Sequence, residues 1–450
     1  MGWGSDFSAR VASRDLTIGV IGLGYVGLPT ALGFHDAGFR VRAVDVNEQV
    51  VARLEAGENP GDDPQHDDLI PAAQSDDWRV STSYRDTIPD CDVVLVTVPT
   101  PVNIDLTPDL SFVRAAGASV FGSLTKGART VAVLESTVYP GVTRELWGGL
   151  LAELELEEGV DVELAYCPER FVPGDPEHGV RQVPRVVGAS NEDVGEGLAE
   201  LYDTLTSGGV TYVGAIEVAE AAKVVENVQR DLNIALVNEL ARIFPNIGLD
   251  VEDVLSAAAT KWNFHRYHPG IGVGGHCIPI DPHYLIARAA ETGTPAELIS
   301  AARAVNRSMP ANVASDIRSI LAANGVVQHD ARILLLGWSY KPGVSDARET
   351  PAEPLAQALR TSGMSVEVWD PYVDPAELPV DLVSPLASPF ESAGFDMAVV
   401  VTAHDEVCDL DWAALAEVAR HPLLYDGRRV LDVDAVAQVG WKLYLLGSPF

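Results

Sequence analysis

The sequence predicts an α/β protein in which two doubly wound parallel sheets are joined by a long helical connector. Residues 15 to about 210 alternate strand-like apolar runs with helix-like stretches, and a second alternating region begins at Arg332. Between these regions, residues 216 to about 325 have mostly helical patterns. Alternation of strands and helices is typical of parallel sheets that helices cover on both faces.

The first predicted strand is followed by a glycine fingerprint for a dinucleotide. An apolar run that ends at Ile21 predicts the strand, and Leu28–Ala37 predicts the helix after it. Between them lie the predicted cofactor residues Gly22, Gly24, Tyr25, Val26 and Gly27. Glycines at this spacing allow a tight turn, a close approach of the backbone to a pyrophosphate and close packing of helix on strand. The pattern therefore predicts a Rossmann-like domain with the pyrophosphate at the helix N-terminus.

Asp45 indicates which dinucleotide to expect. The second strand-like run, Phe39–Val44, ends directly before this residue, which lies 23 positions after Gly22. A carboxylate at this place accepts hydrogen bonds from both ribose hydroxyls and repels a 2′-phosphate. We therefore expect NAD rather than NADP.

The remaining elements are predicted from the same patterns. Strands are expected at 92–98, 130–135, 162–166 and 185–188, and again from Arg332 and at 365–369, 395–401 and 423–426. The segment Glu217–Ile243 predicts one long helix, and another helix is expected to begin near His283. These elements suggest four parts: a disordered tail (1–14), an NAD-binding Rossmann-like domain (15–210), a helical connector (211–325) and a second Rossmann-like domain (326–450).

The net charge limits the partners and the compartment. The chain has 65 acidic against 31 basic residues, a formal charge of −34, and only five lysines. Such a surface disfavours nucleic acid and anionic membranes as partners, and it favours a salt-rich cytoplasm in which molar salt shortens the screening length to about 3 Å. No apolar run approaches the ~20 residues of a membrane span, and no signal peptide is evident at the start, so a cytoplasmic protein is expected.

Cys277 differs from the other three cysteines. None of the four forms a Cys-x-x-Cys pair, so neither a disulfide framework nor a metal site is expected. Cys277 follows a run of glycines within Pro269–Pro282 and precedes Asp281 by four residues. Glycines let the backbone approach a ligand, so this thiol could attack a substrate while the carboxylate holds a water or passes a proton. Alternatively, the segment is an ordinary loop and the cysteine a small buried hydrophobe.

The long predicted helix carries a polar stripe. Glu220, Lys223, Asn227 and Arg230 are spaced by three, four and three residues, which places them on one face. The stripe could be the solvated side of the helix. The rest of the helix is so apolar, however, that we expect it to be buried, and buried polar groups need partners, which a substrate would supply. A partly desolvated lysine suits proton transfer and stabilisation of a developing alkoxide.

These features together predict a reaction. A dehydrogenase that only interconverts an alcohol and a carbonyl has no need of a thiolate. A cysteine permits a second oxidation, because the thiol attacks the aldehyde and the resulting thiohemiacetal is oxidised to a thioester that water hydrolyses. The combination predicts a four-electron oxidation of an alcohol to a carboxylate with two NAD consumed.

Further motifs follow one another along the chain. They are Val98–Pro101, Glu135–Gly141, Cys167–Gly174, Ala219–Lys223, Glu226–Asn227, Arg230–Asn233, Gly274–Cys277, Tyr340–Pro342, Asp346–Glu349 and Asp426–Arg428. With the fingerprint, they make the chain resemble the UDP-glucose/UDP-mannuronic-acid-type nucleotide-sugar 6-dehydrogenase family over roughly residues 16–447. The forms of Glu169–Gly174, Thr260–Phe264 and Gly274–Cys277 resemble the UDP-N-acetylhexosamine branch. Cys167 departs from the family pattern, which usually has a small residue there.

The resemblance implies roles for individual residues. Cys277 is implied as nucleophile, Lys223 as proton donor and acceptor, and Asn227 as oxyanion partner. The remaining implied catalytic residues are Asp281, Glu169 and Thr137, of which the two acids position water. Implied cofactor contacts are Thr100, Thr137 and Arg348, beside the fingerprint residues and Asp45. Implied contacts to the nucleotide sugar are Arg170, Phe171, Lys223, Asn227, Arg230, Lys261, Gly272, Tyr340, Lys341 and Arg428. The connector is implied as a dimerisation domain, so a homodimer or higher homo-oligomer is expected.

The predicted function is NAD-dependent oxidation of the C6 alcohol of a UDP-N-acetylhexosamine, UDP-ManNAc or UDP-GlcNAc, to the uronate, within polysaccharide biosynthesis. A UDP-glucose 6-dehydrogenase is the alternative within the family. A sugar epimerase or short-chain reductase would need a Tyr-x-x-x-Lys pair, which the sequence lacks. A non-catalytic nucleotide sensor is a more distant alternative, which the joint presence of cysteine, lysine and asparagine disfavours.

Overall fold

The computed structural model describes residues 3–60, 69–171 and 177–450, so the Val172–Gly174 end of one motif lies outside the described residues. The chain forms two compact units. The first unit comprises Met1–Glu226 and His283–Thr294, and the second comprises Asn227–Pro282 and Pro295–Phe450. The residues of the predicted connector, 211–325, are therefore divided between the two units.

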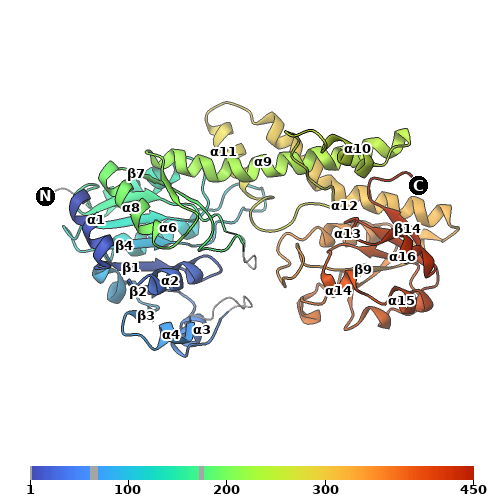
Figure 1. Ribbon diagram of the computed structural model, residues 1–450, viewed down its shortest axis with the longest axis horizontal. Coiled ribbons are helices and arrows are strands. Elements are labelled where there is room, and N and C mark those ends of the chain that lie inside the picture. The colour runs from blue at the N-terminus through green and yellow to red at the C-terminus, as the bar shows by residue number, and fades with distance from the viewer. Residues whose placement is uncertain (1–2, 61–68, 172–176) are drawn as a thin grey trace. The chain divides into compact units, whose positions relative to one another are not determined.

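The described part of the first unit contains an eight-stranded sheet of order β3-β2-β1-β4-β5-β6-β7-β8 (Figure 1). Its strands are β1 (Thr17–Ile21), β2 (Arg40–Val44), β3 (Trp78–Ser81), β4 (Val93–Val96), β5 (Thr130–Leu134), β6 (Val162–Tyr166), β7 (Arg185–Ala189) and β8 (Val210–Tyr212). All neighbours pair in parallel except β6 and β7, which are antiparallel. The predicted parallel sheet is confirmed, with this one exception.

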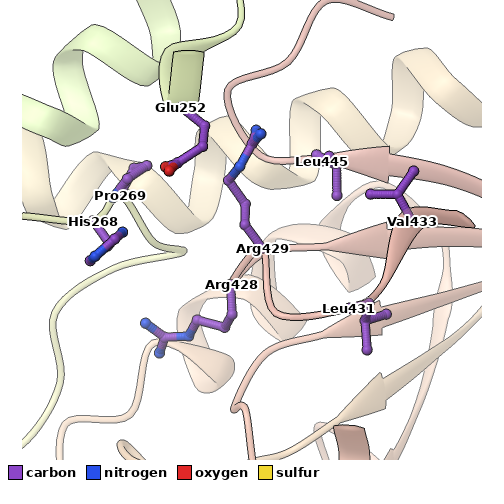
Figure 2. A pocket seen from close by; sticks show the side chains of 8 residues that line it. All are labelled: Glu252, His268, Pro269, Arg428, Arg429, Leu431, Val433 and Leu445. Carbon is purple, nitrogen blue, oxygen red and sulfur yellow. The ribbon is translucent and has the colours of Figure 1, made fainter. Parts of the chain in front are cut away.

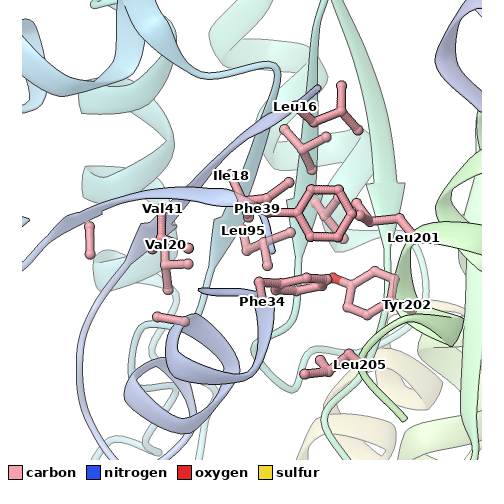
Figure 3. Packing of buried hydrophobic residues seen from close by; sticks show 14 of the residues in the cluster. Leu16, Ile18, Val20, Phe34, Phe39, Val41, Leu95, Leu201, Tyr202 and Leu205 are labelled. Atoms are coloured by element: carbon pink, nitrogen blue, oxygen red, sulfur yellow. The ribbon is translucent and has the colours of Figure 1, made fainter. Parts of the chain in front are cut away.

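Helices accompany the strands of the first unit as in a doubly wound fold. They are α1 (Trp3–Ser13), α2 (Gly27–Asp36), α3 (Glu48–Glu55), α4 (Leu69–Ala73), α5 (Tyr84–Thr87), α6 (Ser111–Phe121), α7 (Gly148–Glu153), α8 (Glu192–Asp203) and most of α11 (Asp281–Glu291). Side chains from β1, β2, α2 and α8 converge on one core (Figure 3). There the ring of Phe34 lies 6.1 Å from that of Phe39 and 5.7 Å from that of Tyr202.

Helix α1 corrects the prediction of a disordered tail over residues 1–14. Phe7 and Val11, four residues apart on one face, are both buried against the first core. Phe7 packs so closely on Gly197 of α8 that a Cβ at Gly197 would lie 2.3 Å from the ring. Arg10 also makes two hydrogen bonds of 2.8 Å with Asp92, at the start of β4. The two apolar residues at helical spacing were the signal that the polar composition hid.

The second unit has a six-stranded, all-parallel sheet of order β11-β10-β9-β12-β13-β14 among its described residues. The strands are β9 (Arg332–Leu336), β10 (Ser365–Trp369), β11 (Ser384–Pro385), β12 (Met397–Val400), β13 (Leu423–Asp426) and β14 (Lys442–Leu445). Its helices are α10 (Val251–Ala258), α12 (Glu297–Ala323), α13 (Ala352–Thr361), α14 (Asp405–Cys408), α15 (Trp412–Val418) and α16 (Val433–Gln438). The predicted second Rossmann-like sheet is thus confirmed.

The long predicted helix is present as α9, Ile216–Ile243, with 28 residues. The expectation that it is buried is wrong for one of its faces. Val218, Val225, Leu236 and Ile243 are 50, 54, 52 and 47% exposed. Their spacings of seven, eleven and seven residues place all four on one stripe. The helix therefore presents an apolar face as well as the polar stripe.

Candidate functional site

The glycine fingerprint forms a tight turn at the end of β1. Gly22 has a φ of +87°, and its N–H donates to Val44 O at 2.8 Å. A Cβ at Gly27 would lie 1.8 Å from Gly22 O, so only glycine fits at position 27. Thr97 fastens the turn, because its hydroxyl donates to Gly22 O at 2.8 Å. Thr97 was not predicted from the sequence, although it directly follows the strand β4.

The same turn has the features of an NAD site. A Cβ at Gly24 would meet nothing within 4 Å, which leaves the backbone there open to a ligand, and α2 begins at Gly27. Asp45 follows β2, and its carboxylate accepts from Leu23 N at 2.7 Å and from Asn47 N at 2.9 Å. Each oxygen retains a lone pair, and the side chain is only partly buried. These residues fit a dinucleotide whose ribose hydroxyls face Asp45.

The two predicted nicotinamide residues lie in the loops that follow β4 and β5. Thr100 is held through its carbonyl oxygen, which accepts from the Tyr284 hydroxyl at 3.0 Å. The residue before Thr137, Ser136, donates its hydroxyl to Val98 O at 2.7 Å and so ties the two loops together. Both threonines lie at the carboxyl ends of parallel strands, where ligands bind in open α/β sheets.

Glu169 and Lys223 meet in the first unit. Lys223 Nζ donates to the backbone oxygen of Glu169 at 2.6 Å, and the Glu169 carboxylate accepts from Phe171 N. Burial raises the pKa of Glu169, although the positive charges of Lys223 and Arg185 partly oppose this. The raised pKa favours the protonated, neutral form of this carboxyl group relative to an exposed one.

Arg170 and Glu220 have partners within the chain. Arg170 makes two hydrogen bonds with Glu226, of 2.6 and 3.1 Å, and a third with Pro184 O at 3.1 Å. Glu220 is fully buried and accepts from Gly141 N at 2.6 Å and from Thr143 N at 2.9 Å. Glu220 therefore holds the loop after β5, so the stripe on α9 is not uniform in role.

A buried charged cluster lies beside Glu169. Arg185 is 1% exposed, and its guanidinium is 3.7 Å from Glu135 and over the ring of Tyr202 at 5.2 Å. Tyr202 donates to Glu135 at 2.5 Å. Burial, chiefly, raises the pKa of the neighbouring Cys167 to about 12, so this thiol stays protonated. The cluster was not predicted, because Arg185 looked like one end of an ordinary strand.

In the second unit the loop that carries Cys277 rests on the segment that follows β9. Gly275 has a φ of +86°, and its N–H donates to Arg348 O at 3.2 Å. A Cβ at Gly275 would lie 2.8 Å from the ring of Tyr340, so the glycine lets the ring pack against the loop. Burial, together with the charges of Asp346 and Cys277, raises the pKa of Tyr340 to about 12. The structure thus brings three predicted site residues, Cys277, Tyr340 and Arg348, into one region.

Asn227 and Asp281 also meet in the second unit. The Asn227 amide donates to the carboxylate of Asp281, which is 2% exposed. Asp281 begins α11, and its N–H donates to Cys277 O at 2.8 Å. The backbone bond fixes the carboxylate one helical turn from the thiol-bearing residue. The predicted amide, acid and thiol are therefore linked within one unit.

The predicted substrate residues of the second unit differ in their surroundings. Arg428 follows β13, its Nε donates to Val401 O at 2.7 Å, and a Cβ at Gly270 would lie 2.8 Å from its Nη1. Beside it lies a cavity of about 210 Å³ (Figure 2). The cavity is lined by Glu252, His268, Pro269, Arg428, Arg429, Leu431, Val433 and Leu445. Gly272 is buried with the Cys277 loop, whereas the side chains of Lys261 and Arg230 are exposed.

Comparison with protein families gives three matches in chain order. They are the NAD binding domain (16–206), the central domain (217–308) and the UDP binding domain (334–433) of the UDP-glucose/GDP-mannose dehydrogenase family.

Among the described residues, no helix combines the length and apolarity that a membrane span requires.

Individual relatives match over almost their whole length. The chain is 36% identical to UDP-N-acetyl-D-glucosamine 6-dehydrogenase of Pseudomonas aeruginosa over 94% of this chain and 98% of that one. Its structure resembles that of UDP-D-ManNAc dehydrogenase from Pyrococcus horikoshii, with a TM-score of 0.85, 31% identity and coverage of 96% and 99%. It also resembles a UDP-glucose dehydrogenase from Pyrobaculum islandicum, with a TM-score of 0.83, 27% identity and coverage of 97% and 98%.

Proposed function

Because the chain belongs to the UDP-glucose/GDP-mannose dehydrogenase family, we propose that it oxidises the C6 alcohol of a UDP-N-acetylhexosamine to the uronate. The proposed substrates are UDP-GlcNAc and UDP-ManNAc, as in the names of its relatives at 36 and 32% identity. The proposed place of action is the cytoplasm, where the product would enter polysaccharide biosynthesis.

The observation that carries this proposal is the setting of Cys277. Its loop is pinned by Gly275 and Tyr340 to the segment after β9, inside the family's UDP binding domain. Asp281 is tied to it by a backbone hydrogen bond and in turn accepts from Asn227. By contrast, burial raises the pKa of both Cys91 and Cys167 to about 12, which makes them poor nucleophiles. A thiol beside a nucleotide-binding segment is placed to bond covalently to a sugar.

The proposed mechanism assigns one task to each group. NAD, when bound to the fingerprint turn and Asp45, supplies a hydride acceptor. Lys223 takes the proton of the C6 hydroxyl, and Asn227 stabilises the oxyanion. Loss of this proton and of a C6 hydride would leave the aldehyde, which Cys277 attacks to give a thiohemiacetal. Loss of a second hydride and of the hydroxyl proton would then leave a thioester, so the two oxidations together need two NAD. Asp281 and Glu169 position the water that hydrolyses the thioester and releases the thiol.

Replacing Cys277 by serine tests the covalent step. We expect Cys277→Ser to abolish uronate formation while NAD affinity stays unchanged, because an alcohol is a far weaker nucleophile than a thiolate near neutral pH. NADH formation at 340 nm and product mass would be measured with UDP-GlcNAc, UDP-ManNAc and UDP-glucose. Cys408→Ser, which alters another partly exposed thiol of the second unit, should retain activity.

The same assays separate the alternatives. Uronate formation by Cys277→Ser at the wild-type rate would remove the thiol from the mechanism. Preference for UDP-glucose would favour the alternative substrate. The structural similarity to the UDP-glucose dehydrogenase of Pyrobaculum islandicum is the reason to include UDP-glucose in the assay. Absence of NADH formation with every nucleotide sugar would favour a sensor over an enzyme.

The exposed face of α9 supports a homodimer. Val218, Val225, Leu236 and Ile243 form one apolar stripe on a surface that is otherwise strongly acidic. A continuous apolar stripe of this kind typically marks a protein interface. We expect light scattering to give at least twice the 48.0 kDa mass of one chain, and Leu236→Glu to lower it. A monomeric wild-type protein would contradict this part of the proposal.

The acidic surface is proposed as an adaptation to high salt. A net charge of −34 repels itself in dilute buffer, and at about 1 M salt the screening length falls to about 3 Å. We therefore expect both the melting temperature and the rate of NADH formation to rise between near-zero and ~3 M KCl. A melting temperature that stays flat or falls over this range would contradict the halophilic interpretation.

A further inference from the structure

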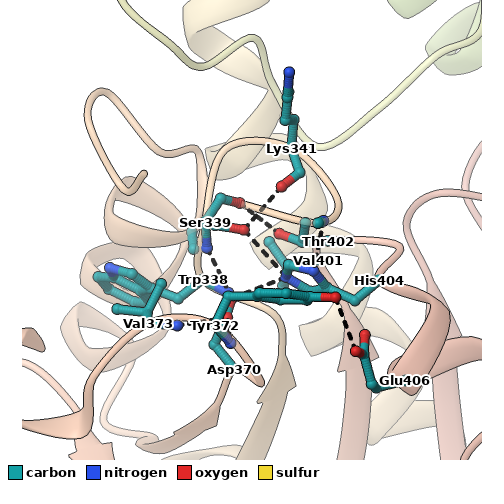
Figure 4. A network of polar contacts seen from close by, with 12 residues as sticks. Trp338, Ser339, Lys341, Asp370, Tyr372, Val373, Val401, Thr402, His404 and Glu406 are labelled. Carbon is teal, nitrogen blue, oxygen red and sulfur yellow. Dashed lines mark hydrogen bonds and ion pairs between the residues drawn. The ribbon is translucent and has the colours of Figure 1, made fainter. Parts of the chain in front are cut away.

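The turn after β9, residues 338–343, carries Lys341 and is held by a buried histidine. His404 is fully buried, and its Nδ1 accepts from Gly343 N at 3.1 Å. Its Nε2 lies 3.0 Å from Asp370 Oδ2 and 3.1 Å from Ser339 Oγ. Figure 4 shows these side chains gathered beneath the turn, with the Lys341 side chain pointing away from them. The histidine thus contacts both ends of the turn.

The contacts determine which nitrogen carries the proton. Gly343 N–H can only donate, so Nδ1 must be the acceptor and the hydrogen must be on Nε2. Ser339 Oγ donates to Lys341 O at 3.0 Å, which leaves this oxygen free to accept from Nε2–H together with Asp370. His404 therefore donates to Ser339, and Ser339 in turn donates to the backbone oxygen of Lys341.

Asp370 anchors the start of the same turn. Its Oδ2 accepts from Trp338 N at 2.6 Å and from Ser339 N at 2.9 Å, in addition to His404. Thr402 supports the same turn from the end of the neighbouring parallel strand β12, because its hydroxyl donates to Ser339 O at 2.6 Å. Almost every polar group of the turn's first half is thus fixed before a ligand binds.

We propose that His404 is a positioning residue that holds the 338–343 turn in the shape in which Lys341 meets the UDP part of the substrate. The inference rests on the proposed function and on the contact to the nucleotide sugar that the family resemblance implies for Lys341. His404 itself does not touch the ligand in this proposal. Its effect passes through two routes, the Gly343 N–H and the Ser339 hydroxyl.

Two substitutions separate the two sides of the imidazole. In His404→Asn the amide oxygen takes the place of Nδ1 and can still accept from Gly343, whereas in His404→Gln the amide nitrogen takes the place of Nε2 and can still donate to Asp370. Ser339→Ala removes only the hydroxyl that reaches Lys341 O. Ser392→Ala is the matched control, because it deletes another fully buried hydroxyl of the same unit, which donates to Glu367.

The experiment measures the Kd of UDP by calorimetry for the full chain and each variant, with unfolding by denaturant as a parallel measurement. We expect His404→Gln and Ser339→Ala to weaken UDP binding about tenfold, His404→Asn to lie closer to wild type than His404→Gln, and Ser392→Ala to bind UDP normally. In a Lys341→Ala background, Ser339→Ala should add little further loss, because both act through the same group.

Each outcome decides a question. Wild-type UDP affinity in Ser339→Ala and His404→Gln would overturn the inference, and so would an equal loss in Ser392→Ala, which would indicate general destabilisation. If His404→Gln does not fold, Ser339→Ala in the wild-type and Lys341→Ala backgrounds decides between the same two outcomes. Absence of UDP binding by the wild-type chain would instead refute the proposed function.

Discussion

In both sheets of this protein the first strand ends in a turn of the same backbone geometry, yet the two turns have different roles. Gly22 ends β1 with a φ of +87° and donates to Val44 O at 2.8 Å. Gly337 ends β9 with a φ of +95° and donates to Trp369 O, also at 2.8 Å. In each sheet the acceptor is the last residue of the second strand, and an aspartate follows it. The backbone construction is therefore shared.

The two aspartates differ in what they bind. Asp45 is partly exposed, and each of its oxygens accepts one backbone hydrogen bond. Asp370 is 7% exposed and accepts from the N–H groups of Trp338, Ser339, Tyr372 and Val373 as well as from His404. Only Asp45 keeps capacity for the hydroxyls of a ribose. The second sheet must therefore recognise its nucleotide with other groups, for which Lys341 and Arg428 are the cationic candidates.

In each sheet a threonine lies just after the strand that neighbours the first one, β4 beside β1 and β12 beside β9. These two threonines support the same contrast between an open and a closed turn. Thr97 follows β4 and donates to Gly22 O, in the turn that is open to a ligand at Gly24. Thr402 follows β12 and donates to Ser339 O, in the turn that His404 fills from below. The same threonine hydrogen bond thus supports a turn that is open to a ligand in the first unit and a turn that packs on His404 in the second.

The largest effect is expected for Asp370→Asn. The substitution removes the charge from a buried group and turns one acceptor into a donor that faces backbone N–H groups. We expect a loss of about 2–4 kcal/mol in the free energy of unfolding of the second unit. Denaturant titration would measure it. A loss below about 0.5 kcal/mol would show that the network around Asp370 does not stabilise the fold.

The pH dependence of that loss gives a second, smaller effect. Although burial opposes the charge of Asp370, hydrogen bonds from His404 and the backbone hold its pKa well below the usual range. A lowered folded-state pKa gives stability that is present above the unfolded pKa, about 3.9, and is lost as the pH falls through the folded value. The difference between wild type and Asp370→Asn should therefore be constant near neutral pH and shrink below about pH 4.

Much of the fold could be predicted because the central strands, among them β1, β4, β5, β12 and β13, are buried on both faces and so appear as continuous apolar runs. Strands β6, β10 and β13 have the expected bounds, and the α9 prediction differs by one residue. The antiparallel pairing of β7 was missed, because the direction of a strand depends on its connection and not on its composition. The tail was missed because the pair Phe7 and Val11 is too short a signal without its partner α8.

The candidate site likewise has residues that the sequence predicts and supporting residues that it does not. The glycines at positions 27 and 275 were predictable, because each lies in a glycine-rich motif that indicates close packing of the backbone. The structure shows which atoms a Cβ would meet at each position. The supporting cluster around Arg185 and that around His404 were not, because their members come from distant positions and are ordinary residues in sequence. Asp370 alone carried a signal, since it follows the second strand of its sheet as Asp45 does.

The smallest effect on stability is expected for the same substitution in the first unit, Asp45→Asn. Only the bond from Leu23 N is lost, so we expect a change of about 1 kcal/mol in the free energy of unfolding. Cofactor choice should change much more, because an amide neither repels a 2′-phosphate nor accepts as strongly from the ribose hydroxyls. We expect kcat/KM to fall about tenfold with NAD and to rise with NADP, whereas Asp45→Glu, which keeps the charge, should still reject NADP. Steady-state rates with both cofactors would measure this, and an unchanged NAD preference in Asp45→Asn would mean that Asp45 is as structural as Asp370, which would remove the contrast between the two sheets.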